Sequence, residues 1–216
     1  MSGPFARPRS GAAAFALAGV LFVLYPALRP WHDESTTDGA IASMSSGAWV
    51  AAHLFAMLGF ILLPLGLLSV RHVVGTGRAG SSASAAVVTT WIGAGLTLPY
   101  FGAEDFALHA IAGKAGAGQN LDVLGLAEAV RFGAVAATTF GLGLVLLAVG
   151  AVLTAVAVWR SGVLPRFSGV PYALGFVLFL PQFYTPPAAR IGHGVLLGVG
   201  LCWLAAALWS SRPTRA

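Results

Sequence analysis

Charged residues are scarce in this sequence. Only 9% of the 216 residues are Asp, Glu, Lys or Arg, whereas 57% are hydrophobic. A soluble domain carries about 25% charged residues, which cover its water-facing surface. The composition therefore excludes a soluble globular protein and indicates an integral membrane protein whose surface mostly meets lipid.

Cysteine is almost absent as well. The one cysteine, Cys202, lies in an apolar run, so an internal disulfide and CxxC redox chemistry are both excluded. We expect it to be a small buried hydrophobic residue. The sequence also contains no P-loop, no HExxH, no GxSxG and no GxGxxG after a strand. No common catalytic motif therefore assigns an activity.

The charge that is present is mainly basic, with 12 Lys and Arg against 7 Asp and Glu. A nucleic-acid-binding protein would carry a basic patch or stripe on one face. Here the basic residues are scattered at the ends of apolar segments. We therefore exclude a nucleic-acid partner and interpret these charges as flanks that orient the chain in a membrane.

Six apolar segments stand out, and a membrane-spanning helix needs about 20 apolar residues. The segments cover approximately residues 11–28, 48–70, 84–112, 126–159, 168–184 and 188–210. They leave no room for a soluble domain, so we predict one domain, residues 1–216. The expected fold is all-α, a polytopic membrane helix bundle of about six transmembrane helices. No clear A-x-A cleavage site follows the first segment, which favours a retained helix over a cleaved signal peptide.

The basic residues between these segments predict the orientation. The segment ends on one side carry eight arginines, and the other side carries three basic residues. The eight are Arg7, Arg9, Arg71, Arg78, Arg160, Arg166, Arg212 and Arg215. The positive-inside rule places both termini in the cytoplasm of a multi-pass cell-membrane protein. The composition, rich in Ala, Gly and Arg, is typical of bacteria with GC-rich genomes.

The remaining ionisable residues gather in the outer part of the predicted membrane layer, whereas the cytoplasmic half is almost purely apolar. Ionisable groups inside a membrane are costly and usually face a bundle interior or a cavity. Our candidates for acid–base catalysis are Glu104, Asp105, His109 and Glu128. Our candidates for substrate binding are Tyr100, Arg131, Tyr184 and Arg190. The joint placement of these residues predicts an outward-facing functional site.

Histidines on three different helices make a metal or haem site one interpretation of this cluster. The candidate ligands are His53, His109 and His193. Zinc binds imidazole nitrogen and carboxylate oxygen, and Asp105, four residues before His109, would orient that ring. A haem with two axial histidines is the second form of the hypothesis. A purely structural role for each histidine, at interfacial water, stays open.

Two functions from different classes remain after these arguments. The first is a membrane-embedded enzyme acting on a lipophilic substrate, or a metal- or haem-binding protein. In either form Arg131 and Arg190 would hold an anionic group. The alternative is a small transporter or an accessory subunit of a membrane complex. A transporter needs a polar site near the midplane, which the apolar cytoplasmic half disfavours. The expected partners are the lipid bilayer and a lipophilic or anionic small molecule; the reaction, the cofactor and the oligomeric state stay open.

Overall fold

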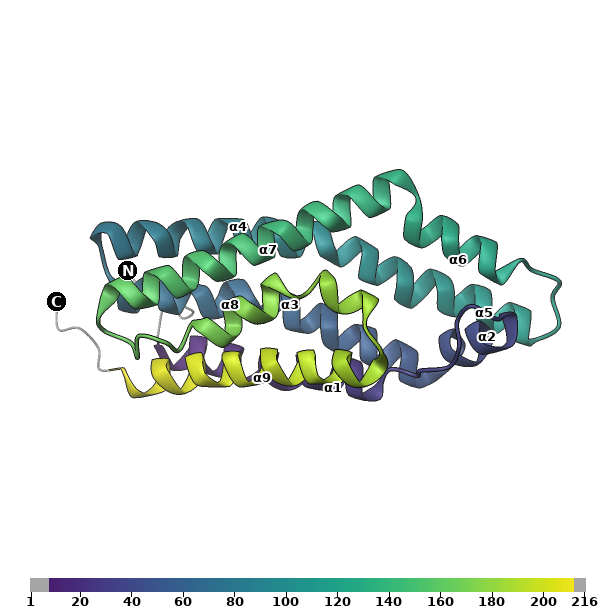
Figure 1. Ribbon diagram of the computed structural model, residues 1–216, viewed down its shortest axis with the longest axis horizontal. Helices are drawn as coiled ribbons and strands as arrows, with labels where there is room; N and C mark the ends of the chain where they lie inside the picture. Colours follow the sequence, from purple (N-terminus) through teal and green to yellow (C-terminus); the bar gives the residue numbers. More distant parts are fainter. Residues whose placement is uncertain (1–7, 212–216) are drawn as a thin grey trace.

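The structure is a computed structural model that describes residues 8–211 of the chain. Within this range every element is helical and no strand occurs. The helices form an elongated bundle (Figure 1). The expectation of an all-helical protein is confirmed.

Five helices within residues 8–211 are long and apolar enough to cross a membrane. The first two are α1 (Pro8–Leu28) and α3 (Gly47–Val74). The third is a continuous unit of α4 (Gly77–Gly102), the π-helical turn η2 (Ala103–Ala107) and α5 (Leu108–Gly116). The last two are α7 (Ala134–Ser161) and α9 (Pro187–Ser210). The multi-pass membrane architecture is therefore supported by length and composition.

The predicted sixth span, 168–184, is not one helix. It contains α8 (Val170–Val177) and the 3-10 helix η3 (Pro181–Tyr184). Eight α-helical residues extend about 12 Å, well short of the hydrocarbon core of about 30 Å. Proline explains the break, because Pro181 cannot donate the backbone hydrogen bond that would continue α8. Figure 1 shows α8 and η3 running beside α9 along much of its length.

The predicted span 126–159 is also interrupted. The helix α6 (Val123–Phe132) ends at Gly133, whose ψ of 132° is not helical, and α7 begins at the next residue. Glu128 and Arg131 therefore belong to a separate short helix rather than to the first turns of a membrane span. This corrects the predicted placement of both side chains.

Small residues let the long helices approach closely. On α9, a Cβ added at Gly194 would lie 2.7 Å from the Phe22 carbonyl oxygen of α1, and one at Gly198 would lie 2.6 Å from Val23 Cγ2. Between α7 and α4, a Cβ at Gly143 would lie 2.6 Å from Thr97 Oγ1. Contacts this short leave no room for a side chain, as is typical of packed membrane helices.

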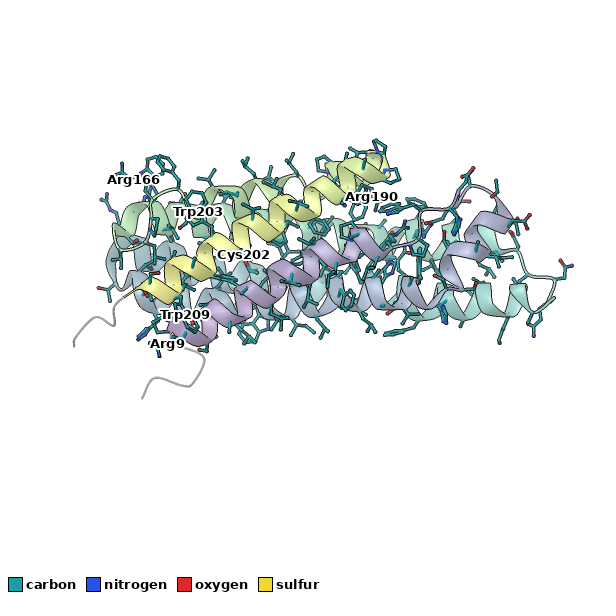
Figure 2. All side chains as sticks on the ribbon, turned by 90° about the horizontal axis from the view of Figure 1, so that it is seen from below. Arg9, Arg166, Arg190, Cys202, Trp203 and Trp209 are labelled. Carbon is teal, nitrogen blue, oxygen red and sulfur yellow. The ribbon has the colours of Figure 1, made fainter. Side chains whose placement is uncertain are left out.

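The two ends of the bundle differ. At one end, which we call the terminal end, α1 begins and α9 finishes, and the Arg9 guanidinium carbon lies 5.6 Å from the Trp209 ring centroid (Figure 2). The chain therefore enters the bundle and leaves it at the same end. The five long apolar helices are an odd number, which would by itself put the two ends of the chain on opposite sides. At the opposite end, α2 (Thr37–Met44), α5 and α6 gather into what we call the helical cap.

The helical cap has a hydrophobic core of its own, separate from the core of the long bundle. Its buried members are Ala40, Met44, Trp49, Leu108, Ala112, Val123 and Ala127. The continuous helix Gly77–Gly116 has 40 residues and is about 60 Å long, twice the thickness of a hydrocarbon core of about 30 Å. One end of this helix therefore extends beyond the lipid tails, and the cap packs around it.

Cys202 lies on the exposed side of α9, beside Trp203 (Figure 2). The expectation that it is buried is wrong. In a membrane protein, a residue in an apolar segment need not be buried inside the protein, because apolar side chains are as stable in lipid as in a protein core.

Candidate functional site

A cavity of about 560 Å³ lies where the long helices meet the helical cap. Its walls come from the ends of α1, α4 and α6, the starts of α3, α7 and α9, the loop after α1, η2 and η3. Tyr25, Arg29, Trp31, His32, Glu34, His53, Tyr100, Phe101, Glu104, Arg131, Phe132, Ala137, Phe140, Gly141, Leu180, Phe183, Tyr184, Thr185, Pro187 and Arg190 line it. Ligand sites commonly have this size and this mixture of aromatic and charged walls.

Two arginines and two glutamates form a chain of ion pairs along one wall. Arg131 donates to Glu104 through Nε (2.6 Å to Oε1) and Nη2 (3.0 Å to Oε2), which is a two-pronged contact. Its Nη2 also donates to Glu34 Oε2 at 2.8 Å. Arg29 Nη2 donates to the other oxygen of Glu34 at 2.6 Å. The planar guanidinium matches two carboxylate oxygens at once, so these pairs fix geometry as well as charge.

The ring of Trp49 packs against both arginines of these ion pairs. Its indole N–H donates to the Glu104 carbonyl oxygen at 3.0 Å. The guanidinium carbons of Arg29 and Arg131 lie 4.8 Å and 5.9 Å from its ring centroid. Trp49 is buried, so its ring does not reach lipid headgroups. Instead it holds two cations by cation–π attraction.

The surroundings of Arg131 keep its guanidinium protonated. Burial alone would lower the pKa of the guanidinium, because it penalises the charged form. The neighbouring carboxylates of Glu104 and Glu34 outweigh that effect, and the pKa is raised above its ordinary value. Arg131 is therefore a permanent cation of the cavity wall.

Arg190 differs from the other two arginines because no carboxylate within residues 8–211 forms an ion pair with it. Its Nε donates to the neutral Gln182 Oε1 at 3.2 Å. The guanidinium carbon lies 4.7 Å from the Trp31 ring centroid and 5.1 Å from that of Phe183. None of the ion pairs found in residues 8–211 includes Arg190. Three arginines thus face two glutamates in the cavity, which leaves one positive charge in excess.

His53 and Tyr100 complete the polar wall. The buried ring of His53 lies 4.3 Å from that of Trp49, and its Nδ1 is 2.8 Å from the Trp49 carbonyl oxygen. A carbonyl only accepts, so Nδ1 carries the hydrogen and Nε2 is left for another partner. The Tyr100 ring stacks on Phe140 at 4.0 Å. These packed rings make the wall rigid.

The structure brings six of the predicted site residues to this cavity. They are His53, Tyr100, Glu104, Arg131, Tyr184 and Arg190. Glu128 is exposed on α6, outside the cavity. It forms no ion pair with Arg131, three residues further along α6, because that guanidinium points to Glu104 and Glu34. Asp105, His109 and His193 also lie outside the lining.

The three histidines do not converge. The Nδ1 of His109 binds the Met44 carbonyl oxygen at 2.8 Å, and the Nε2 of His193 binds that of Gly175 at 2.7 Å. No three His, Cys, Asp or Glu side chains are placed to hold a metal ion anywhere in the described part of the chain. The expected zinc ligands are therefore not assembled. The two axial histidines of the haem hypothesis are not assembled either, since His53 is the one member of the trio that lines the cavity.

Asp105 is turned away from the cavity although Glu104 precedes it. Both residues lie in η2, whose π-helical turn gives the helix a wider local winding. Asp105 is fully buried, and neither carboxylate oxygen has a hydrogen-bond partner among the described residues. Asp105 does not line the cavity, whereas Glu104 does. The position of Asp105 therefore does not support its predicted role in acid–base catalysis.

The sequence-based interpretation missed Arg29 and Glu34. Both lie in the stretch after the first apolar segment, where charges usually meet water and carry no special role. A weak signal existed, because Arg29 follows the apolar segment directly and Glu34 lies on the same predicted side as the cluster. Only the fold shows that this loop folds back over the cavity and supplies two of the four members of the ion-pair chain.

The cavity is suited to binding more clearly than to bond making. Both oxygens of Glu104 accept hydrogen bonds from Arg131, so this carboxylate is committed to an ion pair and is not a free base. The excess positive charge and the aromatic walls instead match a ligand with one anionic group and an apolar body. No protein-family model, curated protein or solved structure matches the chain.

Proposed function

We propose that the protein is a cell-membrane protein that binds an amphiphilic anion in the cavity between its long helices and its helical cap. The ligand class is a carboxylate or phosphate group joined to an apolar body. The observation that carries the proposal is Arg190, a cation on the cavity wall whose polar partner is a neutral amide. An incoming anion supplies the missing countercharge through charge-assisted hydrogen bonds.

The terminal end faces the cytoplasm in this proposal, and the cavity faces outside. Support comes from Arg9 and Arg166 at the terminal end (Figure 2), together with the other arginines of the same predicted side. Lys and Arg concentrate on the cytoplasmic flanks of membrane helices. The bound molecule therefore comes from the outer leaflet or from the outside.

Transport through the bundle is the weaker alternative. A transporter needs a polar site that is reached from both faces. Here buried aromatic rings lie beside the cavity and continue into the bundle core: Phe60 lies 5.3 Å from Phe101, 5.1 Å from Phe22 and 5.6 Å from Phe179. These interlocked rings offer no polar path. A binding protein, a binding subunit of a membrane complex, or an enzyme acting on the bound amphiphile agrees better with this core.

The test uses a fluorescent long-chain carboxylate, cis-parinaric acid, and the purified protein in lipid nanodiscs. The Arg190→Gln variant removes the unpaired charge, and we expect at least about tenfold weaker binding, as a charge-assisted hydrogen bond contributes about 1.5–3 kcal/mol. The methyl ester of the same acid, which has no charge, should bind weakly to both proteins.

Arg166→Gln is the matched control. Like Arg190, Arg166 stacks on an aromatic ring, 4.9 Å from Trp159, but it lies far from the cavity. Its removal should leave the affinity unchanged. Equal affinities of the Arg190→Gln variant and the unmodified protein, or equal binding of acid and ester, would overturn the proposed function.

A further inference from the structure

The cavity has two chemically different sides. Its charges come from Arg29, Arg131 and Arg190 and their partners, on the α1 loop, the cap and α9. Its apolar walls come from the first turns of α7 and from η3, where Phe140, Gly141 and other apolar residues line the space. Arg190 lies where the charged and apolar walls meet, because the ring centroid of Phe183, in η3, is 5.1 Å from its guanidinium carbon. A ligand that places its anion at Arg190 therefore places its apolar part between α7 and η3.

The cavity is open on its apolar side. There Phe132, Tyr184 and Leu180 line it and are exposed by 71%, 84% and 42%. A side chain that lines a cavity and is exposed at the same time forms the rim of an opening. The rim therefore includes the end of α6 and η3, next to the start of α7, and it continues to His32, which is exposed in the loop after α1 and also lines the cavity.

The fold explains why an opening occurs here. The helix α8 packs against both α7 and α9, and it ends at Val177. Beyond it the chain winds into η3, which packs against α9. Towards α7 the contact of η3 is made by two rings, Phe183 and Phe140, 5.9 Å apart. A full sixth helix would close this wall, whereas the short helix α8 followed by η3 leaves an opening in it.

The part of the opening at η3 is next to an apolar surface. It lies beside α7, one of the helices with the length and composition of a membrane span. The outer surface of this helix is apolar, with Val135 and Leu142 exposed by 81% and 56%. In a bilayer such side chains meet acyl chains.

We propose that the ligand is a long-chain lipid that enters sideways from the adjacent leaflet, with its anionic headgroup at Arg190 and its acyl chain passing out between α7 and η3. This inference rests on the proposed function and narrows its ligand class. The headgroup is a carboxylate or a phosphate. A short, water-soluble anion fills only the charged side of the cavity and leaves its apolar walls exposed, so it binds much more weakly.

Gly141 provides a test. It lines the cavity, and a Cβ added there would meet no atom within 4 Å, so a large side chain can grow into the ligand space without a backbone clash. Gly95 is the matched control, because it lies in the middle of α4, is exposed outside the cavity and also has no atom within 4 Å of an added Cβ. The variants are Gly141→Trp and Gly95→Trp, with Gly141→Leu as a smaller plug.

The measurement is the affinity of each variant in nanodiscs for cis-parinaric acid and for phosphatidic acid that carries a parinaroyl chain, with the probe excited directly. We expect at least tenfold weaker binding to Gly141→Trp, a smaller loss for Gly141→Leu, and no change for Gly95→Trp. Whichever probe binds the unmodified protein identifies the headgroup. Equal thermal unfolding midpoints of the two Trp variants show that the plug does not act by unfolding the protein.

The possible failures are distinguishable. If the probe binds and depends on Arg190, but both Gly141 variants bind as well as Gly95→Trp, the lateral position of the chain is wrong and the proposed function stands. If neither probe binds the unmodified protein, or Arg190→Gln binds as well, the proposed function itself fails.

Discussion

At the scale of single residues, the chain of ion pairs from Arg29 to Glu104 carries most of the charge at the cavity. Each carboxylate in it accepts from two guanidinium nitrogens, and its members are largely buried. In such a chain, removing one partner leaves the others uncompensated. The individual charges are therefore more important for stability than isolated surface ion pairs are.

Glu104→Gln tests this view. We expect it to lower the free energy of unfolding by about 2–4 kcal/mol, because it leaves the buried Arg131 with a weaker partner. The measurement is the unfolding midpoint in detergent against a denaturant series. Glu128→Gln, an exposed carboxylate on the same cap, should change stability by less than about 0.5 kcal/mol. Equal effects of the two substitutions would show that the ion-pair chain is not a structural unit.

Sequence reasoning found Glu104, Arg131 and Arg190 because charged residues within apolar segments are rare, and rarity itself is informative. It failed for the histidines for a geometric reason. Depth along a helix can be counted from the sequence, but the face that the side chain occupies depends on the packing of neighbours. The sequence predicted His53, His109 and His193 in one membrane layer, yet each donates to a different carbonyl.

At the scale of elements, close packing between α4 and α7 holds one wall of the site in place. Gly143 has Thr97 and the backbone of α4 against it. For α4 and α7 the sequence indicated long apolar helices but not which of their glycines touch, because a glycine facing lipid and one facing a helix have the same context. Gly95 on α4 is exposed and has open space around it.

Gly143→Ala should destabilise the protein by about 1–3 kcal/mol, because the added methyl forces the two helices apart. Gly95→Ala should instead be neutral or stabilise it, by up to about 1 kcal/mol, since alanine favours the helix. Thermal unfolding of both variants in the same detergent measures the difference. A loss of stability at Gly95 as large as that at Gly143 would contradict the assigned contact.

Helix boundaries were the least predictable feature of this fold. The break at Gly133 and the shortness of α8 were hidden in apolar runs, since hydropathy averages over a window and does not register one changed backbone angle. These two breaks shape the cavity. The break at Gly133 makes α6 a separate helix, from which Arg131 reaches Glu104. The early end of α8 leaves the opening beside η3.

At the scale of the whole molecule, the account requires a fixed orientation. The single cysteine allows a clean measurement in a Cys202→Ser background. Thr76→Cys places a thiol in the exposed α3–α4 connection, and Gln119→Cys places one in the exposed α5–α6 connection. In intact cells a membrane-impermeant maleimide should label Gln119→Cys, and it should label Thr76→Cys only after lysis. The reverse pattern would show that the cavity faces the cytoplasm.

In the proposed function, the cavity holds an amphiphilic anion through Arg190. The most direct measurement is native mass spectrometry of the protein extracted gently from its own membrane, with the retained small molecules identified after release. We predict a bound anionic lipid on the unmodified protein and on Arg166→Gln, and its loss from Arg190→Gln. An unmodified protein that carries no such molecule, or an Arg190→Gln variant that retains it in full, would contradict the account.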